Sequence, residues 1–114
     1  MITKFKLYEE LNVGEPEVGD YIISDIKING EMIRLNNLIG KYSKFINNHH
    51  KDDYNYIVYY TIPDNFLIND NILKRHGSLN GNRYKINLSR SEIEYWSKDK
   101  EDLEDVLATK DFNL

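Results

Sequence analysis

The stretch DYNYIVYYTIP, residues 53–63, holds four tyrosines, two isoleucines and a valine within eleven residues. Successive side chains of a β-strand point to opposite faces of the sheet. One face of this strand would carry Tyr54, Tyr56, Val58, Tyr60 and Ile62. The other face would carry Asn55, Ile57, Tyr59 and Thr61. Proline cannot donate a hydrogen bond to a neighbouring strand, so we expect the strand to end at Pro63. The pattern predicts the central strand of a small sheet, with one face in the core and a mixed face open to a partner.

Residues before this stretch predict further strands and one short helix. Residues 18–29 are rich in β-branched side chains and alternate in part, with a bend near Ser24 and a turn at Asn29–Gly30. Residues 31–40 have apolar side chains at helical spacing, which predicts a helix of one to two turns ending at Gly40. Residues 41–46 then predict a strand.

Residues after the stretch predict a hairpin and a terminal helix. Asn80–Gly81 is a strong hairpin signal, which would join a short strand around Leu79 to the alternating residues 83–88. Residues 99–108 fit a helix that Ser97 or Asp99 could cap. The apolar stripe of this helix is Leu103, Val106 and Leu107. A helix of about ten residues is unstable alone in water, so the stripe must dock on the domain or on a partner.

Length and composition limit the classes of protein to which the chain can belong. Its 114 residues suffice for one domain with one modest core. The absence of cysteine excludes disulfides, thiolate zinc sites and cysteine nucleophiles. The net charge is −4, which on average repels phosphate. We found no apolar run long enough for a transmembrane helix and no secretory signal at the start, so we expect no membrane association.

Four segments in order resemble a known pattern. They are VGDYIIS (18–24), LIGKYSKF (38–45), YNYIVYYTIP (54–63) and EIEYWSKDKEDLE (92–104). This order is similar to that of a loosely defined group of small uncharacterised phage and large-virus proteins, which look like SH3-like β-barrels with a short C-terminal helix. The resemblance implies a viral origin and a location in the host cytoplasm or in the virion, and it assigns no catalytic residue.

Together these observations predict a mainly β (α+β) fold. We expect residues 1–114 to form a single domain, an SH3-like β-barrel over 18–97 with a short internal helix, followed by a C-terminal α-helix over 98–110.

Candidates for chemistry are few. His49, His50, Asp52 and Asp53 are the one metal-like cluster in the sequence, and we interpret them as a solvated polar turn, because metal ligands usually come from separate elements. The carboxylates of residues 92–105 stand in a run beside lysines, which is typical of a solvated face. No nucleophile elbow or P-loop spacing occurs. We therefore predict no enzymatic activity, no metal and no cofactor.

The exposed aromatic and basic side chains are the candidate interaction surface. We assign Ile57, Tyr59, Trp96, Arg75 and Arg83 to it. An alternative for Trp96 is that it anchors the terminal helix to the barrel. Seven basic residues also lie in the middle of the chain: Lys41, Lys44, Lys51, Lys74, Arg75, Arg83 and Lys85.

Three functions follow as hypotheses. The first is a non-enzymatic protein-binding module, either a minor virion component or an inhibitor of a host or defence protein. The second is a small β-barrel that binds nucleic acid through basic and stacking side chains. The third, a small enzyme or metal protein, has the least support. The first fits the acidic composition and the lack of catalytic motifs best.

Overall fold

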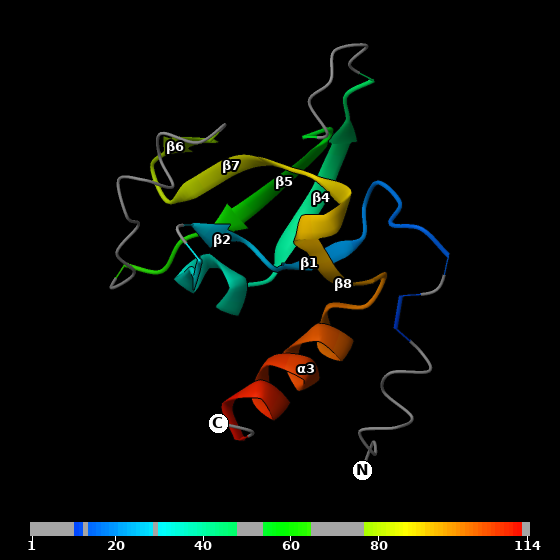
Figure 1. Ribbon diagram of the computed structural model, residues 1–114, viewed down its shortest axis with the longest axis vertical. Helices are drawn as coiled ribbons and strands as arrows, with labels where there is room; N and C mark the ends of the chain where they lie inside the picture. Colours follow the sequence, from blue (N-terminus) through cyan, green and yellow to red (C-terminus); the bar gives the residue numbers. More distant parts are fainter. Residues whose placement is uncertain (1–10, 13, 29, 48–53, 65–76, 113–114) are drawn as a thin grey trace.

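The computed structural model describes residues 11–12, 14–28, 30–47, 54–64 and 77–112. These residues form a six-stranded antiparallel sheet, a two-stranded hairpin and one C-terminal α-helix, which confirms a mainly β fold (Figure 1). The elements are β1 (Tyr21–Ser24), β2 (Lys27–Ile28), β3 (Glu31–Met32), η1 (Arg34–Asn37), β4 (Gly40–Phe45), β5 (Tyr56–Thr61), β6 (Gly77–Asn80), β7 (Arg83–Leu88), η2 (Arg90–Glu92), β8 (Ile93–Ser97) and α3 (Lys100–Phe112). The strand order in the large sheet is β6-β7-β5-β4-β1-β8.

The tyrosine-rich stretch forms β5 and is a central strand, as its alternation predicts. It pairs with β4 on one side and with β7 on the other. Val58 and Tyr60 are almost fully buried, and Tyr56 packs against the same core cluster. We call this side of the sheet the inner face and the opposite side the outer face. The strand ends at Thr61, two residues before Pro63.

The inner face is covered by the connection between β1 and β4. Ile26 and Leu35 are buried in the main core, and Ile28, Ile33 and Leu38 pack against it. The hairpin β2–β3 turns at Gly30, whose φ of 83° is one that glycine adopts readily. The edge strands β6 and β8 do not pair with each other in the described residues, so hydrogen bonds do not close the sheet into a barrel there.

The predicted internal helix is shorter than expected and differs in type. Glu31–Met32 is a strand, Arg34–Asn37 is a 3₁₀ helix, and Gly40 begins β4. Gly40 is therefore no helix cap, and packing explains why glycine is needed there. A Cβ atom built on it would lie 2.5 Å from Val58 Cγ1 and 2.8 Å from Tyr60 Cε1.

We expect Gly40→Ala to lower the free energy of unfolding by about 2 kcal/mol, since the added methyl group overpacks two fully buried side chains. Urea unfolding at equilibrium measures the effect. Ser43→Ala in the exposed part of the same strand is the control, with an expected change within about 0.5 kcal/mol. Equal midpoints for Gly40→Ala and the unmodified protein would contradict the packing at Gly40.

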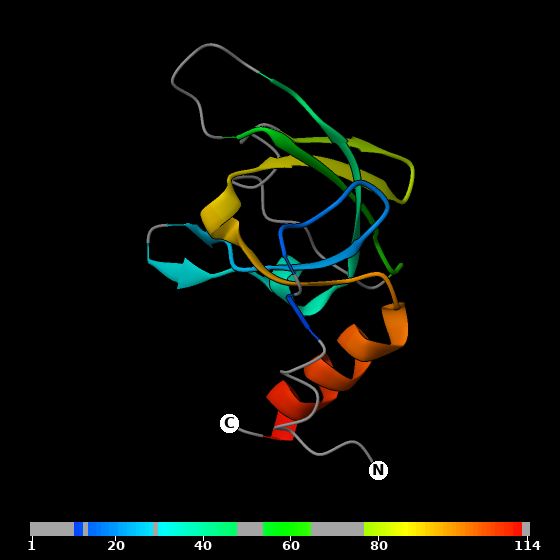
Figure 2. The same cartoon turned by 90° about the vertical axis from the view of Figure 1, so that its right-hand side faces the viewer.

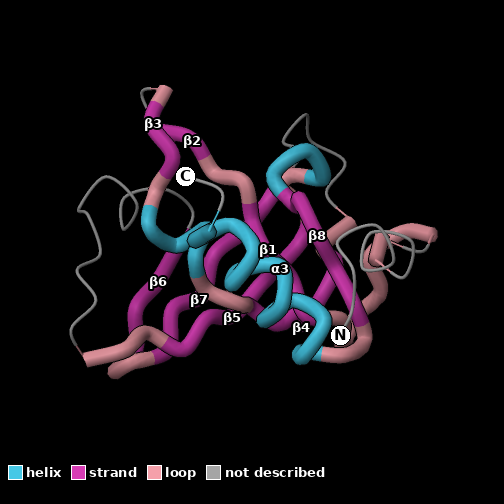
Figure 3. The backbone as a smooth tube through the Cα atoms, turned by 90° about the horizontal axis from the view of Figure 1, so that it is seen from below, coloured by secondary structure: helices cyan, strands magenta, loops and turns pink. Residues whose placement is uncertain are grey.

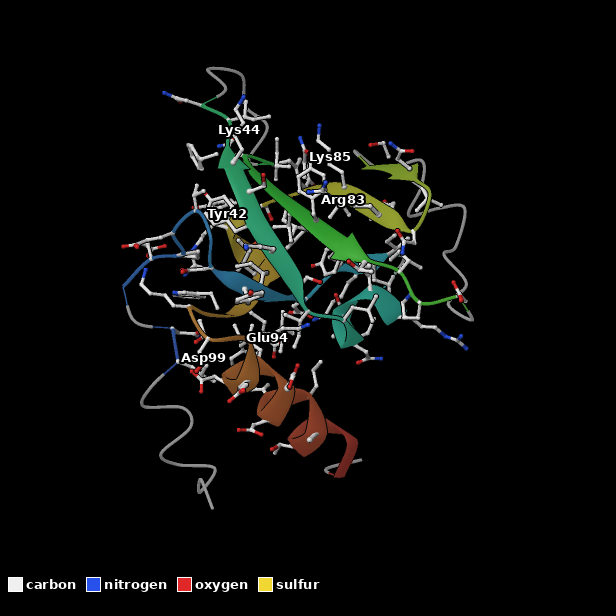
Figure 4. The ribbon with its side chains drawn as sticks, turned by 180° about the vertical axis from the view of Figure 1, so that it is seen from behind. Tyr42, Lys44, Arg83, Lys85, Glu94 and Asp99 are labelled. Atoms are coloured by element: carbon white, nitrogen blue, oxygen red, sulfur yellow. The ribbon has the colours of Figure 1, made fainter. Side chains whose placement is uncertain are left out.

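Helix α3 starts and docks as predicted, and it runs further than residue 110. The Glu101 N–H donates to Asp99 Oδ1 at 3.2 Å, so Asp99 caps the first turn. Leu103 and Val106 are buried with Ile23 in a second core cluster, against which Leu107 packs. Figure 2 shows α3 on the side of the sheet where β1 and β8 lie, and Figure 3 shows α3 in front of the strands when the molecule is seen from below. The helix therefore packs on the outer face at β1 and β8, away from Arg83 and Lys85 of β7 (Figure 4).

Candidate interaction site

The outer face of β4, β5 and β7 is basic. Lys41 and Lys44 come from β4, and Arg83 and Lys85 come from β7. The four strands from β4 to β7 contain no aspartate or glutamate. Figure 4 places Lys44, Arg83 and Lys85 on one part of the sheet, away from Glu94 and Asp99 beside α3. We call the side chains Lys41, Lys44, Tyr59, Arg83 and Lys85 the basic face.

Strand register places Tyr59 at the centre of the basic face. Tyr59 lies opposite Lys41 on β4 and opposite Lys85 on β7. Lys44 and Arg83 extend the two basic rows in opposite directions from this line. Neighbouring strands are about 4.8 Å apart, so the rows on β4 and β7 are separated by roughly 10 Å, with β5 between them.

Two cations of the basic face stack on tyrosine rings. The guanidinium carbon of Arg83 lies 4.0 Å from the ring centroid of Tyr59, and Lys41 Nζ lies 5.5 Å from that of Tyr21. Stacking holds a cation in place while its N–H groups stay free to donate. Within the described residues, no carboxylate forms an ion pair with any of the four cations. Their charge is therefore available to an external anion.

A shallow hollow of about 330 Å³ opens between the basic face and the loop before β1. Its lining residues are Val18, Gly19, Lys41, Tyr42, Ser43, Tyr59 and Arg83. The loop is fixed to β4, since the Gly19 N–H donates to the Tyr42 carbonyl at 2.8 Å. Burial, and to a smaller extent the neighbouring Tyr56, raises the pKa of the Tyr42 phenol. Tyr42 therefore stays neutral at physiological pH, and the charge of the hollow comes from Lys41 and Arg83.

A second region, formed by the loop before β1, the residues around β8 and helix α3, is acidic and contains internal ion pairs. Arg90 Nε lies 2.7 Å from Glu15 Oε2, and Lys98 Nζ lies 2.8 Å from Glu17 Oε2. The hydrogen bond from Lys98 lowers the pKa of Glu17, and the same bond raises the pKa of Lys98. Exposed carboxylates of α3 add to this region: Glu101, Glu104 and Asp105. The net charge of −4 thus conceals two regions of opposite sign.

Of the five residues predicted to form the interaction surface, two are in contact in the structure, two are buried, and one lies outside the described residues. Tyr59 and Arg83 are in direct contact. Ile57 is only 5% exposed and Trp96 only 6% exposed, so assigning them to an exposed surface was wrong. Arg75 lies outside the described residues.

Trp96 belongs to the main core because it lies opposite Ile22 in the pairing of β1 with β8. The guanidinium carbon of Arg90 lies 4.5 Å from its ring centroid. Tyr95, which points to the other face, packs against the cluster around α3. Trp96 is thus buried, as the alternative expected, while the core cluster that holds α3 includes Tyr95 and not Trp96.

Lys41, Lys44 and Lys85 are not among the five residues of the surface predicted from the sequence. The sequence signal for part of the basic face is the alternation within RYKINL. It predicts that Arg83 and Lys85 point to the face opposite to that of the buried Tyr84 and Ile86. The pairing of β5 with both β4 and β7, which brings the lysines together, is not visible in one sequence.

The metal-like cluster predicted at residues 49–53 lies outside the described residues. In the part of the chain that the structure describes, no group of three or more histidines or carboxylates is arranged to hold a metal ion. The helices within that part are also too short or too polar to span a bilayer.

Comparison with known proteins identified no relative: the chain matches no protein-family model, no curated protein and no solved structure. The resemblance to small viral β-barrel proteins therefore stays a prediction, and the function has to be argued from the basic face itself.

Proposed function

We propose that the chain is a non-enzymatic protein-binding module whose basic face binds an acidic segment of a partner protein. The observation that carries this proposal is the separation of charge, with four cations and no carboxylate on strands β4 to β7. Cations that form no ion pair with a carboxylate of the described residues gain most from an anion supplied by another molecule.

An extended acidic segment fits the spacing of the cations. Arg83 and Lys85 are two residues apart on β7, which separates them by roughly 7 Å along the strand. Alternate side chains of an extended peptide have the same separation. Arg83, held by Tyr59, can donate two parallel N–H bonds to one carboxylate.

Nucleic acid is the less favoured partner for two reasons. Proteins that bind single strands stack the bases on free aromatic rings, whereas Arg83 and Lys41 already stack on Tyr59 and Tyr21. The acidic region around Glu17 and α3 would also repel a long polyanion that extended past the basic face.

We further propose that the complete chain forms a small SH3-like barrel. The antiparallel order of the six-stranded sheet and the covering of its inner face by the β1–β4 connection support this architecture. A minor virion component, or an inhibitor of a host or defence protein, is the setting that we propose for such a binding surface.

Charge reversal tests the role of the basic face. The probe is a fluorescein-labelled 12-residue peptide of alternating glutamate and serine, with binding followed by fluorescence anisotropy at low salt. We expect Lys44→Glu/Lys85→Glu to weaken binding about tenfold, because each reversal replaces an attraction with a repulsion. The control Lys27→Glu/Lys100→Glu changes the net charge equally at exposed positions outside the basic face, and it should leave the affinity within about twofold.

A labelled 12-nucleotide oligothymidylate is titrated in parallel. Tighter binding of the oligonucleotide than of the peptide, lost in the Lys44→Glu/Lys85→Glu variant, would overturn the protein-binding proposal in favour of the nucleic-acid alternative. Equal weakening by both double variants would show that the peptide responds to net charge and not to the basic face.

A further inference from the structure

The hollow beside the basic face has an apolar rim as well as cations. Val18 is 61% exposed, the highest value among the large hydrophobic side chains that are exposed in the described residues. It lines the same hollow as Lys41, Tyr59 and Arg83. Single exposed hydrophobic side chains are common on protein surfaces. A binding role for Val18 therefore depends on how rigidly it is held and on which side chains surround it.

The turn that carries Val18 is rigid. The Glu17 N–H donates to Asp20 Oδ2 at 2.8 Å, and the Asp20 N–H donates back to the Glu17 carbonyl at 2.9 Å. Gly19 has a φ of 98°, which this turn requires and which few other residues tolerate. The Tyr42 N–H donates to the Asp20 carbonyl at 2.9 Å and joins the turn to β4. Val18 is therefore presented in one position, and a ligand that contacts it has no loop to order.

Charge and apolar surface are combined in the hollow. Lys41 and Arg83 offer charged donors to an acidic side chain, while Val18 and the edge of Tyr59 offer apolar contact. A volume of about 330 Å³ is near the lower limit for ligand pockets, so it suits one or two side chains and not a folded surface.

We propose that this hollow anchors an acidic residue of the partner together with an aliphatic residue next to it. The inference rests on the proposed function and adds the class of sequence that the face selects. Acidic segments that contain a leucine, isoleucine or valine beside a glutamate or aspartate are then bound in preference to purely polar acidic segments.

Two labelled peptides of identical charge test the proposal. Both have alternating glutamate and serine over 12 residues, and one has leucine in place of the central serine. We expect the leucine peptide to bind about fivefold more tightly to the unmodified protein. In the exposed-site variant Val18→Ser this preference should disappear, because the leucine peptide loses its apolar contact. Met32→Ser, at another exposed hydrophobic residue, is the control and should keep the preference.

The outcomes separate this proposal from the proposed function. Equal affinity for the two peptides, or a leucine preference that survives Val18→Ser, would overturn the anchoring role and leave the basic face as a general acidic site. A Val18→Ser variant that weakens both peptides equally would also overturn it. Failure of both peptides to bind the unmodified protein would overturn the proposed function itself.

Discussion

Asn36→Leu is expected to lower the free energy of unfolding by about 4 kcal/mol. Asn36 is 2% exposed, and its side chain makes three hydrogen bonds in the core. Its Oδ1 accepts from the Ser24 hydroxyl and from the Ile26 N–H, and its Nδ2 donates to the Ile26 carbonyl, each at 2.9 Å. Leucine removes these bonds and leaves the Ser24 hydroxyl and the Ile26 N–H without this partner, at a cost of about 1–3 kcal/mol each. The Ile26 carbonyl still accepts a hydrogen bond from the Ile33 N–H at 3.3 Å.

Leucine has the same branching as asparagine and is no smaller, so that a cavity does not account for the effect. Urea unfolding followed by tryptophan fluorescence measures it, because Trp96 is the sole tryptophan and lies in the main core. Asn37→Leu applies the same change to the next residue, which is exposed, and should alter stability by less than about 0.5 kcal/mol. Similar effects at both positions would contradict a specific role of the Asn36 side chain.

The Asn36 hydrogen bonds also bear on the binding surface. They connect the end of β1 to η1, and η1 leads through Gly40 into β4, which carries Lys41. Lys41 reaches the basic face only if β4 starts in the observed register opposite β5. The position of the polar surface thus depends on a buried amide on the other face of the sheet.

Local signals were sufficient for the elements that depend on neighbouring residues. Alternation identified β5 and its buried face, and Asn80–Gly81 identified the hairpin of β6 and β7. Ser97, Asp99 and the spacing of Leu103 identified the start and the buried side of α3. Each of these signals lies within a few residues of the structure that it predicts.

Features that depend on distant residues were missed. Asn36 has the sequence signature of a turn residue, and its partners Ser24 and Ile26 become visible only in the folded chain. Gly40 fits a helix end by position, whereas its actual role depends on Val58 and Tyr60 of β5.

The same holds for the candidate site: features set by neighbouring residues were predicted, and features set by residues distant in sequence were not. Composition gave an acidic protein, and alternation gave the outward direction of Tyr59 and Arg83. The basic face arises because β5 lies between β4 and β7, which brings together cations more than forty residues apart in sequence, such as Lys41 and Lys85. A single sequence contains no direct record of that pairing.

Leu103→Ala is expected to lower the free energy of unfolding by about 3 kcal/mol. Leu103 has no exposed surface and packs with Ile23 and Val106 between α3 and the sheet. Truncation to alanine removes its apolar contacts and leaves a cavity, which in protein cores costs about 2–5 kcal/mol. Glu104→Ala, at the next and exposed residue, keeps helix propensity high and should change stability by less than about 0.5 kcal/mol.

The same variant separates stability from binding. Because α3 packs on β1 and β8, away from Arg83 and Lys85 of the basic face (Figure 4), Leu103→Ala protein that is still folded should bind the glutamate–serine peptide with unchanged affinity. Anisotropy titration at a temperature well below the unfolding transition of the variant measures this. Weaker binding by the folded variant would mean that the helix helps to form the acidic-segment site. It would then contradict our division of the outer face into a part that packs against α3 and a separate part that binds the peptide.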